Sequence, residues 1–173
     1  WENMGMMHTQ VRRAMTEDWQ ALRAVRLRAL ADAPSAFSSS WEHESAFEEE
    51  RWRHRAEQGN WFLAWSPLST GPATRMADGL AGAVLRPGTG GCELIGMWVD
   101  PAVRGLHVGR ELVAAAAGWA HRSDAGRLDL WVVTENLSAR DFYRRQGFFE
   151  TGELQEVSGR PEAVELGMSL PLI

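Results

Sequence analysis

The clearest chemistry in the sequence is offered by a short segment with two glycines, residues 104–110, which reads RGLHVGR. It follows an apolar run that ends in VDP at residues 99–101, and it precedes an alanine-rich helical pattern. A loop between a strand and a helix directs consecutive backbone amides, and the positive end of the helix, at one anionic group. The segment therefore predicts a phosphate or pyrophosphate site, with an ordinary turn as the alternative.

Other phosphate-binding signatures do not fit this sequence. The pattern GxxxxGK[ST] is missing, and the glycine-rich residues 88–91 precede an expected strand, whereas a dinucleotide fingerprint follows one. His107 stands where a phosphate-binding loop would more comfortably have glycine. The loop tolerates histidine there if residue 107 keeps φ below zero, because then only its amide is needed and the imidazole can point outward.

Three side chains outside this segment could also take part in chemistry. Tyr143 is the only tyrosine of the chain, and it stands two helical turns after Asn136 on the same side of an expected helix. Glu93 begins an apolar strand. The period of two along a strand predicts that Glu93, Ile95, Met97 and Val99 project from one face.

The elements that must position these residues follow from periodicity and from turn signals. Strands are expected at residues 9–14, 61–65, 77–86, 92–101 and 128–134, with a closing pair after residue 148. Helices are expected after an N-cap at Thr16, then over residues 44–57, 108–123 and 136–148, the last capped by Asn136. This order predicts an α/β or α+β domain with a mixed sheet and a central strand, helix, strand crossover.

Length and composition exclude several classes of protein. The 173 residues, with 45% hydrophobic and 24% charged residues, predict one folded domain over residues 7–173. Residues 1–6 are expected to be disordered or derived from a vector. The net charge of −5 argues against nucleic-acid binding, and a single cysteine excludes a disulfide framework.

The same sequence gives no sign of a membrane protein or a metalloprotein. No apolar run has the length of a signal peptide or a membrane span, so we expect a cytoplasmic protein without membrane contact. The histidines lack metal-ligand spacing with cysteine or carboxylates, so no metal is expected.

A second motif gives the first one a context. Asn136, Ala139, Phe142 and Tyr143, followed by Gly147-Phe148, combine with residues 104–110 into a pattern that resembles the GCN5-related N-acetyltransferase (GNAT) superfamily. In that family an Arg/Gln-x-x-Gly-x-Gly/Ala loop follows a strand, and a later Asn…Ala…Tyr…Gly-Phe helix completes the site. The resemblance is close over roughly residues 80–150 and covers the element order of nearly the whole chain.

The resemblance implies a GNAT fold, with a mixed central sheet of six to seven strands, flanking helices and a splayed strand pair that holds coenzyme A. It implies an N-acetyltransferase that moves the acetyl group of acetyl-CoA directly to a primary amine of a small molecule, peptide or protein. The implied cofactor-binding residues are Met97, Val99, Arg104, Gly105, Leu106, His107, Val108, Gly109, Arg110, Asn136, Ala139 and Phe142.

The resemblance also assigns two catalytic roles. Tyr143 would protonate the departing thiolate, with a core aromatic as the alternative. Glu93 would accept the proton of the amine, directly or through water, with a surface carboxylate as the alternative. Cys92 is not assigned a covalent role, because no histidine partner is evident.

The acceptor side is the least defined part of the pattern. Residues 36–50 lie where the family builds its acceptor wall, so Phe37, Trp41 and Glu42, with Glu44, are candidates to receive a cation. The alternative is a solvated acidic helix. The sequence does not identify the amine. A catalytically silent CoA-binding module of the same fold is the rival function, and a homodimer is compatible with the resemblance.

Overall fold

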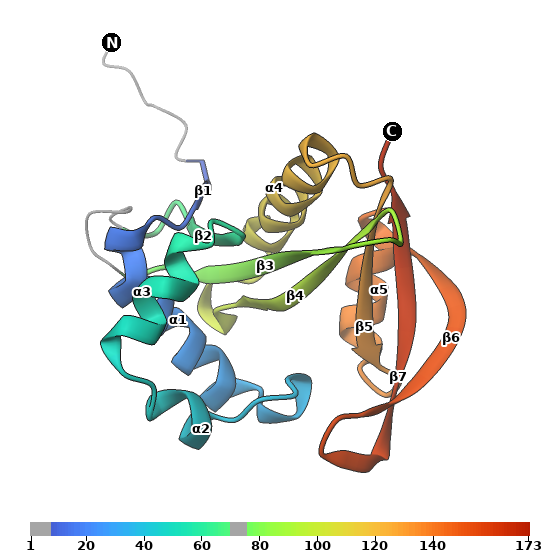
Figure 1. Ribbon diagram of the computed structural model, residues 1–173, viewed down its shortest axis with the longest axis horizontal. Helices are drawn as coiled ribbons and strands as arrows, with labels where there is room; N and C mark the ends of the chain where they lie inside the picture. Colours follow the sequence, from blue (N-terminus) through green and yellow to red (C-terminus); the bar gives the residue numbers. More distant parts are fainter. Residues whose placement is uncertain (1–7, 70–75) are drawn as a thin grey trace.

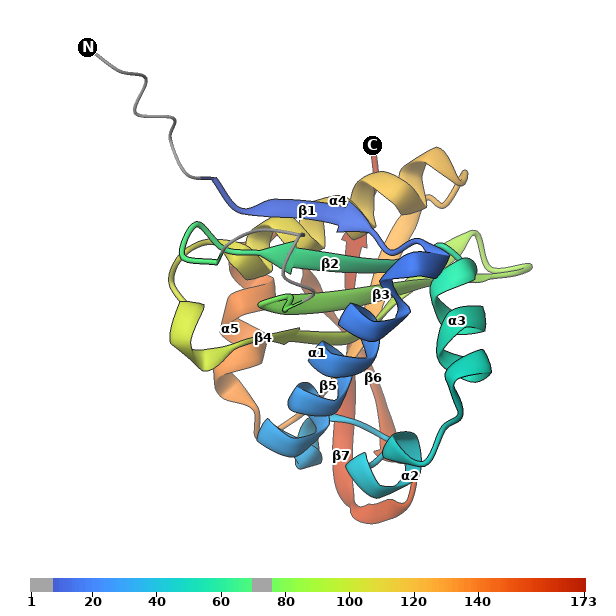
Figure 2. The same ribbon diagram turned by 90° about the vertical axis from the view of Figure 1, so that its left-hand side faces the viewer.

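The computed structural model describes residues 8–69 and 76–173, and these form a curved mixed sheet with helices on both faces (Figures 1 and 2). The expectation for residues 1–6 lies outside the described part of the chain. Within that part, no helix has the length and apolar character that a membrane crossing requires.

The elements follow the order expected from the sequence. The strands are β1 Gln10–Arg13, β2 Trp61–Trp65, β3 Gly79–Arg86, β4 Gly91–Val99, β5 Arg127–Val133, β6 Phe149–Val157 and β7 Arg160–Pro171. The helices are α1 Trp19–Asp32, α2 Trp41–Ser45, α3 Glu49–Glu57, α4 Val108–Arg122 and α5 Leu137–Arg145. Short 3₁₀ turns occupy Thr16–Asp18, Pro34–Ala36 and Pro101–Val103.

The seven strands have the order β1-β2-β3-β4-β5-β7-β6. All neighbouring pairs are antiparallel except β4 and β5, which are parallel and joined through α4. A parallel pair needs such a crossover connection. The mixed sheet and its central crossover are therefore confirmed.

Two hydrophobic cores cover the two faces of the sheet. Helices α4 and α5 pack on one face, where Leu112, Leu128 and Tyr143 belong to one cluster of buried residues. Helices α1 and α3 pack on the other face, where Leu22, Trp52 and Trp98 belong to the second cluster. Figure 1 shows α4 on one side of β2–β4 and α1 to α3 on the other. Each face therefore has its own helical cover.

Two helical expectations were wrong. Thr16 does not cap α1, which begins three residues later; the nearby Asp18 carboxylate instead accepts a bond from the Met15 amide (2.8 Å) and pairs with Arg12. The helix expected over residues 44–57 is two helices, because Glu48 adopts extended backbone (φ −65°, ψ 158°) between them. This turn lets Phe47 pack against the second core while Glu44 is buried.

A β-bulge in β4 overturns the expected common face of Glu93, Met97 and Val99. Leu80 of β3 pairs with Trp98, but Gly82 pairs with Ile95, so one residue of β3 faces two of β4. The bulge includes Gly96 at φ +60°, a left-handed value that favours glycine. Ile95, like Trp98, packs on the α1 side, whereas Met97 and Val99 pack on the α4 side. The bulge thus reverses the face of the sheet to which alternate residues of β4 point.

Candidate active site

The central feature of the site is the divergence of β4 from β5. Their parallel pairing covers Gly91–Glu93 against Arg127–Asp129 and does not continue. Beyond it, β4 stays paired with β3 through Val99, and β5 stays paired with β7 through Val133. Figure 1 shows the two strands diverging from their paired ends. One edge of each strand is therefore free to accept backbone hydrogen bonds from a ligand.

Two cavities occupy the region of this divergence. The smaller, of about 530 Å³, lies among the end of β4, the loop before α4 and the helix α5. The larger, of about 950 Å³, lies between the open strands, helices α1 to α3 and the β6–β7 hairpin. Both are lined by Phe37, Met97, Asn136, Ala139 and Tyr143, so the two cavities meet at these side chains.

The expected anion loop lines the smaller cavity. Helix α4 begins at Val108. The first amide of this helix that donates a backbone hydrogen bond is that of Glu111, which donates to the His107 carbonyl (3.1 Å). Within the described residues, the amides of residues 108–110 have no backbone acceptor, as is normal for a helix start. Leu106 is the exception in the loop: it faces a different cavity, and its amide donates to the Val103 carbonyl (3.3 Å).

His107 adopts a backbone conformation that the sequence analysis did not expect. Its φ is +64° and its ψ is 8°, which is the left-handed region. The condition of a negative φ is therefore not met. A β-carbon in this region costs free energy that glycine avoids. The side chain is exposed at the wall of the smaller cavity, and the backbone strain is retained.

The two glycines of the loop serve different purposes. Gly105 has φ +87° and open space around its missing side chain, so its backbone angle explains it. Gly109 instead packs closely: a β-carbon there would lie 3.1 Å from the Phe142 ring and 3.3 Å from the Met97 methyl group. Helix α4 can therefore approach both α5 and β4 only without a side chain at residue 109.

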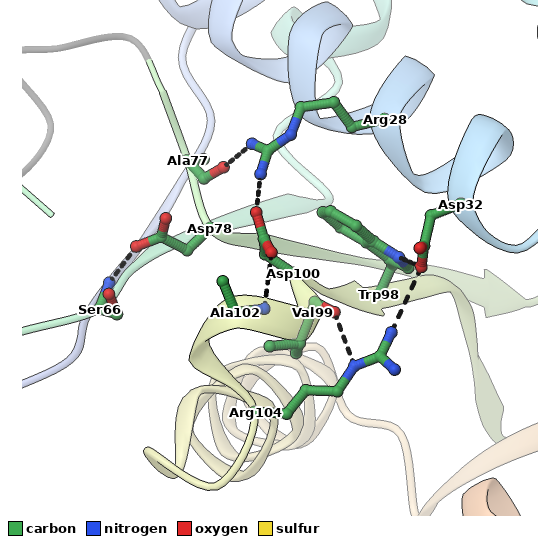
Figure 3. Close-up of polar contacts among 10 residues, drawn as sticks. All are labelled: Arg28, Asp32, Ser66, Ala77, Asp78, Trp98, Val99, Asp100, Ala102 and Arg104. Carbon is green, nitrogen blue, oxygen red and sulfur yellow. Dashed lines mark hydrogen bonds and ion pairs between the residues drawn. The ribbon is translucent and has the colours of Figure 1, made fainter. Parts of the chain in front are cut away.

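Arg104 is held by protein groups at the rim of the smaller cavity. Its Nε donates to the Val99 carbonyl (3.1 Å), and its Nη2 lies 3.4 Å from the Asp32 carboxylate. The Trp98 indole donates to the same Asp32 oxygen (2.9 Å), as Figure 3 shows. The Val99 carbonyl, expected to be free for the cofactor arm, thus already accepts a bond from Arg104.

The turn before the loop is anchored to α1 by the same network (Figure 3). Arg28 forms an ion pair with Asp100 and donates to the Ala77 carbonyl (2.8 Å). Asp100 in turn accepts from the Ala102 amide (2.9 Å). These contacts fix the end of β4 and therefore fix the position from which the loop begins.

Tyr143 lies where the two cavities meet. It is 9% exposed and packs edge-on against Phe142 and Phe148. Burial raises the pKa of its phenol well above the usual range, so the phenol stays protonated at neutral pH. In the described part of the chain, no hydrogen-bond partner is found for its hydroxyl. This differs from the alternative of a core tyrosine with a backbone partner.

Asn136 caps α5 as expected. Its Oδ1 accepts from the Ala139 amide (3.1 Å), which leaves the side-chain amide nitrogen available at the wall of both cavities. Helix α5 ends before Gly147 at φ +97°. Capping and ligand contact are compatible at this residue.

Glu93 lines the larger cavity in an ion pair with Arg86. Both contacts of the guanidinium are with Oε2, and the Arg86 Nε lies 2.7 Å from it. Among the described residues, Oε1 has no hydrogen-bond partner. The neighbouring Cys92 is buried, which raises the pKa of its thiol to about 11 and keeps it protonated.

The acceptor candidates are placed unevenly. Phe37 lines both cavities, but Trp41 and Glu42 are exposed on α2 and line neither. Glu44 lines the larger cavity, although its carboxylate is bound by two arginines instead of being free for a cation. Neither arginine, Arg26 nor Arg55, was predicted from the sequence as part of this site. The available signal was a charged residue, Arg26, within the apolar stripe of α1.

Comparison with protein-family models matches residues 26–148 to the acetyltransferase (GNAT) family. Among curated proteins, an uncharacterized N-acetyltransferase of Methanocaldococcus jannaschii is 38% identical over 58 residues, which are 34% of this chain and 26% of that protein. The chain thus matches about a quarter of that relative's length.

Solved structures share the fold over nearly the whole chain. Ribosomal-protein-alanine N-acetyltransferase from Brucella melitensis has a TM-score of 0.73 and 23% identity, covering 94% of this chain and 99% of that one. A putative acetyltransferase from Salmonella typhimurium, solved with its cofactor acetyl-CoA, has a TM-score of 0.72 and 16% identity, covering 96% and 95%. These likenesses confirm the predicted fold. The family match over residues 26–148 shows in addition that the chain belongs to the GNAT acetyltransferase family.

Proposed function

We propose that this protein transfers the acetyl group of acetyl-CoA directly to a primary amine within a ternary complex. The observation that carries the proposal is the meeting of the two cavities at Met97, Asn136 and Tyr143. A donor in the smaller cavity and an amine in the larger one would come into contact there, which is the requirement for direct transfer. Family membership supports N-acetyl transfer as the reaction.

The smaller cavity fits the cofactor in two respects. The unbonded amides of residues 108–110 would hold the pyrophosphate at the start of α4. The free edge of β4 around Met97 would pair with the amide groups of the pantetheine arm, as an added strand does. When bound, acetyl-CoA supplies the acetyl group as a thioester. Arg104, held by Asp32 and Val99, would contribute its charge at the rim.

Tyr143 is proposed as the proton donor to the sulfur. During transfer the amine nitrogen bonds to the acetyl carbon, the carbon–sulfur bond breaks, and the sulfur takes one proton. The Tyr143 phenol is protonated and lines both cavities. The nitrogen loses a further proton when the amide forms, and this proton restores the Tyr143 phenol, so the step balances.

Glu93 is proposed as the group that receives the proton of the amine. An alkylammonium must lose a proton before it can attack, and the free Oε1 of Glu93 can take it directly or through a water molecule. Arg86 holds the carboxylate in place through the other oxygen. Phe37 is proposed as an acceptor contact, and the same role for Trp41 and Glu42 would require that α2 move toward the cavity.

The ion pair of Glu93 with Arg86 also favours the rival function, a CoA-binding module without turnover, because it engages the proposed base. Incubation with acetyl-CoA and a panel of amines decides between the two. Release of free thiol together with a product heavier by one acetyl group is expected. Calorimetric binding of CoA without thiol release for any amine would support the rival. The cytoplasmic location and the homodimer stay predictions.

A further inference from the structure

A buried arginine on the wall of the larger cavity has an unused donor group. Arg26 of α1 is 8% exposed, and its Nε and Nη2 donate to the Glu44 carboxylate at 3.1 and 2.9 Å. Its Nη1 is buried and has no hydrogen-bond partner among residues 8–69 and 76–173. A buried donor without an acceptor is costly and uncommon in a folded protein. The wall of this cavity therefore contains a binding group that the protein itself does not satisfy.

The surroundings of Arg26 carry excess positive charge. Glu44, 2% exposed, is the one carboxylate bound there, and it also accepts from Arg55 (2.7 Å). Arg51 lines the same cavity with its guanidinium over the Phe47 ring, and it has no carboxylate partner in the described part of the chain. Three guanidinium groups thus face one carboxylate. Since burial weakens screening, this wall attracts an anion.

The other carboxylates of the cavity lie on its opposite walls. Glu93 on β4 is paired with Arg86, which also lines the cavity, and Glu156 and Glu165 line it from the β6–β7 hairpin. A ligand in this cavity is therefore met by an excess of cations on the side of α1 and α3 and by an excess of carboxylates on the opposite side. Such a division suits a molecule that carries an anionic group as well as an amine.

The unused donor lies close to the junction with the smaller cavity. A β-carbon built on Gly96 would lie 3.3 Å from Arg26 Nη1, and the next residue of the bulge, Met97, lines both cavities. The Phe37 ring covers the guanidinium at 4.8 Å, so a group that binds Nη1 takes the place of this ring. An anion bound here would hold the acceptor beside the transfer point.

We propose that the acceptor is an amino acid, a primary amine that also carries a carboxylate, and that Arg26 binds this carboxylate with the help of Arg51. Arginine matches the geometry of a carboxylate and remains charged at all relevant pH values. The proposal rests on the proposed acetyl transfer for the fate of the amine. Binding of the carboxylate by Arg26 is expected whether or not acetyl transfer takes place.

The first experiment compares matched acceptors. Amino acids and ω-amino carboxylates are tested against their amides and against n-alkylamines of the same length, with thiol release as the signal. We expect kcat/KM at least tenfold higher for the carboxylates, as the loss of a charged hydrogen bond requires. Equal values for acids and amides would overturn this inference and leave acetyl transfer intact. The spacing preferred within the ω-amino series measures the distance between the two groups.

The second experiment repeats this comparison with variants and adds a binding measurement that does not depend on turnover. Arg26→Gln should lower the preference for the carboxylate at least tenfold, and Arg51→Gln should lower it less. Arg53→Gln is the matched control, because Arg53 lies on α3, pairs with Glu49 and does not line the cavity. Binding of hexanoate, which has no amine, is measured by calorimetry in each protein. Hexanoate binding that is equal in the parent, Arg26→Gln and Arg51→Gln proteins, or absent from the parent, would overturn the proposal.

Arg26→Gln leaves Glu44 with one cation fewer, so its folding is checked by circular dichroism. If that variant does not fold, Arg51→Gln carries the test, since the Arg51 side chain is exposed. A second variant, Arg26→Lys, is measured beside Arg51→Gln. If both fold and both keep the carboxylate preference of the parent protein, the assignment of Arg26 and Arg51 to a carboxylate site is contradicted. Absence of thiol release with every amine, together with hexanoate binding that depends on Arg26, would refute the proposed transfer and retain the carboxylate site.

Discussion

The smaller and the larger cavity are built in opposite ways. The smaller is lined mostly by two continuous stretches, residues 103–110 and 136–146, and it offers backbone amides. The larger is lined by side chains from α1 to α3, β4, β5 and the β6–β7 hairpin, and it contains a buried ion-pair cluster. Any sequence that adopts this loop provides the backbone amides, whereas the larger cavity depends on particular side chains at particular positions. A common cofactor and a particular acceptor are thus recognised by different means.

The largest effect is expected from a charge placed in the smaller cavity. Gly109→Glu puts a side chain against Phe142 and Met97 and a carboxylate beside the anion-binding amides, so CoA binding should be lost by calorimetry. Ala114→Glu, on an exposed position of the same helix, is the matched control and should bind normally. Retained affinity in folded Gly109→Glu would remove the loop from the cofactor site.

The next largest effect concerns the stability of the larger cavity. Burial alone would raise the pKa of Glu44, but its hydrogen bonds with Arg26 and Arg55 prevail and lower it to about 2. Because the folded pKa is depressed, the stabilisation is complete above the unfolded pKa and is lost as the pH falls through both values. The contribution is of the order of 3 kcal/mol.

This contribution can be measured by urea unfolding between pH 7 and pH 3. Glu44→Gln should be less stable than the parent at pH 7 by about 3 kcal/mol, and the difference should shrink as the pH falls below about 4. Glu42→Gln, on the exposed side of α2, is the control and should change little. A difference between parent and Glu44→Gln that is independent of pH would show that the carboxylate charge does not stabilise this wall.

Tyr143→Phe tests the point where the two cavities meet. It removes the proposed proton donor and keeps the aromatic packing against Phe142 and Phe148, so kcat should fall about 100-fold. CoA affinity should change less than about threefold, because the hydroxyl acts at the sulfur. Steady-state kinetics and calorimetry give the two numbers. Unchanged turnover would remove Tyr143 from the reaction.

The smallest effect is expected at His107. His107→Gly removes the left-handed strain of a β-carbon but adds freedom to the unfolded chain, so a net gain of about 0.5–1 kcal/mol is expected. Chemical unfolding measures this gain. His121→Gly, within the last turn of α4, should instead destabilise the protein. A loss of stability in His107→Gly would mean that the imidazole makes a contact that outweighs the strain.

The contrast between the cavities also explains what the sequence could predict. Residues 104–110 and the cap at Asn136 act through local backbone geometry, which short patterns encode, and both occur where expected. The change of face in β4 was not predictable from alternation, because the bulge at Gly96 depends on the register with β3. The condition of a negative φ for residue 107 followed from side-chain sterics alone and did not take the geometry of the turn into account.

The acceptor wall was less predictable for the same reason. Arg26 and Glu44 are 18 positions apart, and their bond depends on how α1 packs against α2. From sequence alone, Glu44 was grouped with the exposed Trp41 and Glu42 as a cation receptor, whereas burial made it the partner of arginines. Tertiary packing decided the sign of charge that this wall presents.

Asp32 links helix α1, which lines the larger cavity, to the rim of the smaller cavity. One carboxylate oxygen at the end of α1 holds both Trp98 of β4 and Arg104 of the loop (Figure 3). Arg26 lies on the same helix at the wall of the larger cavity. A ligand that displaces α1 therefore also displaces the rim of the cofactor site. Thermodynamic linkage makes such an effect reciprocal: if acceptor binding changes CoA affinity by some factor, CoA changes acceptor affinity by the same factor. The two ligands then bind cooperatively, as partners in one equilibrium.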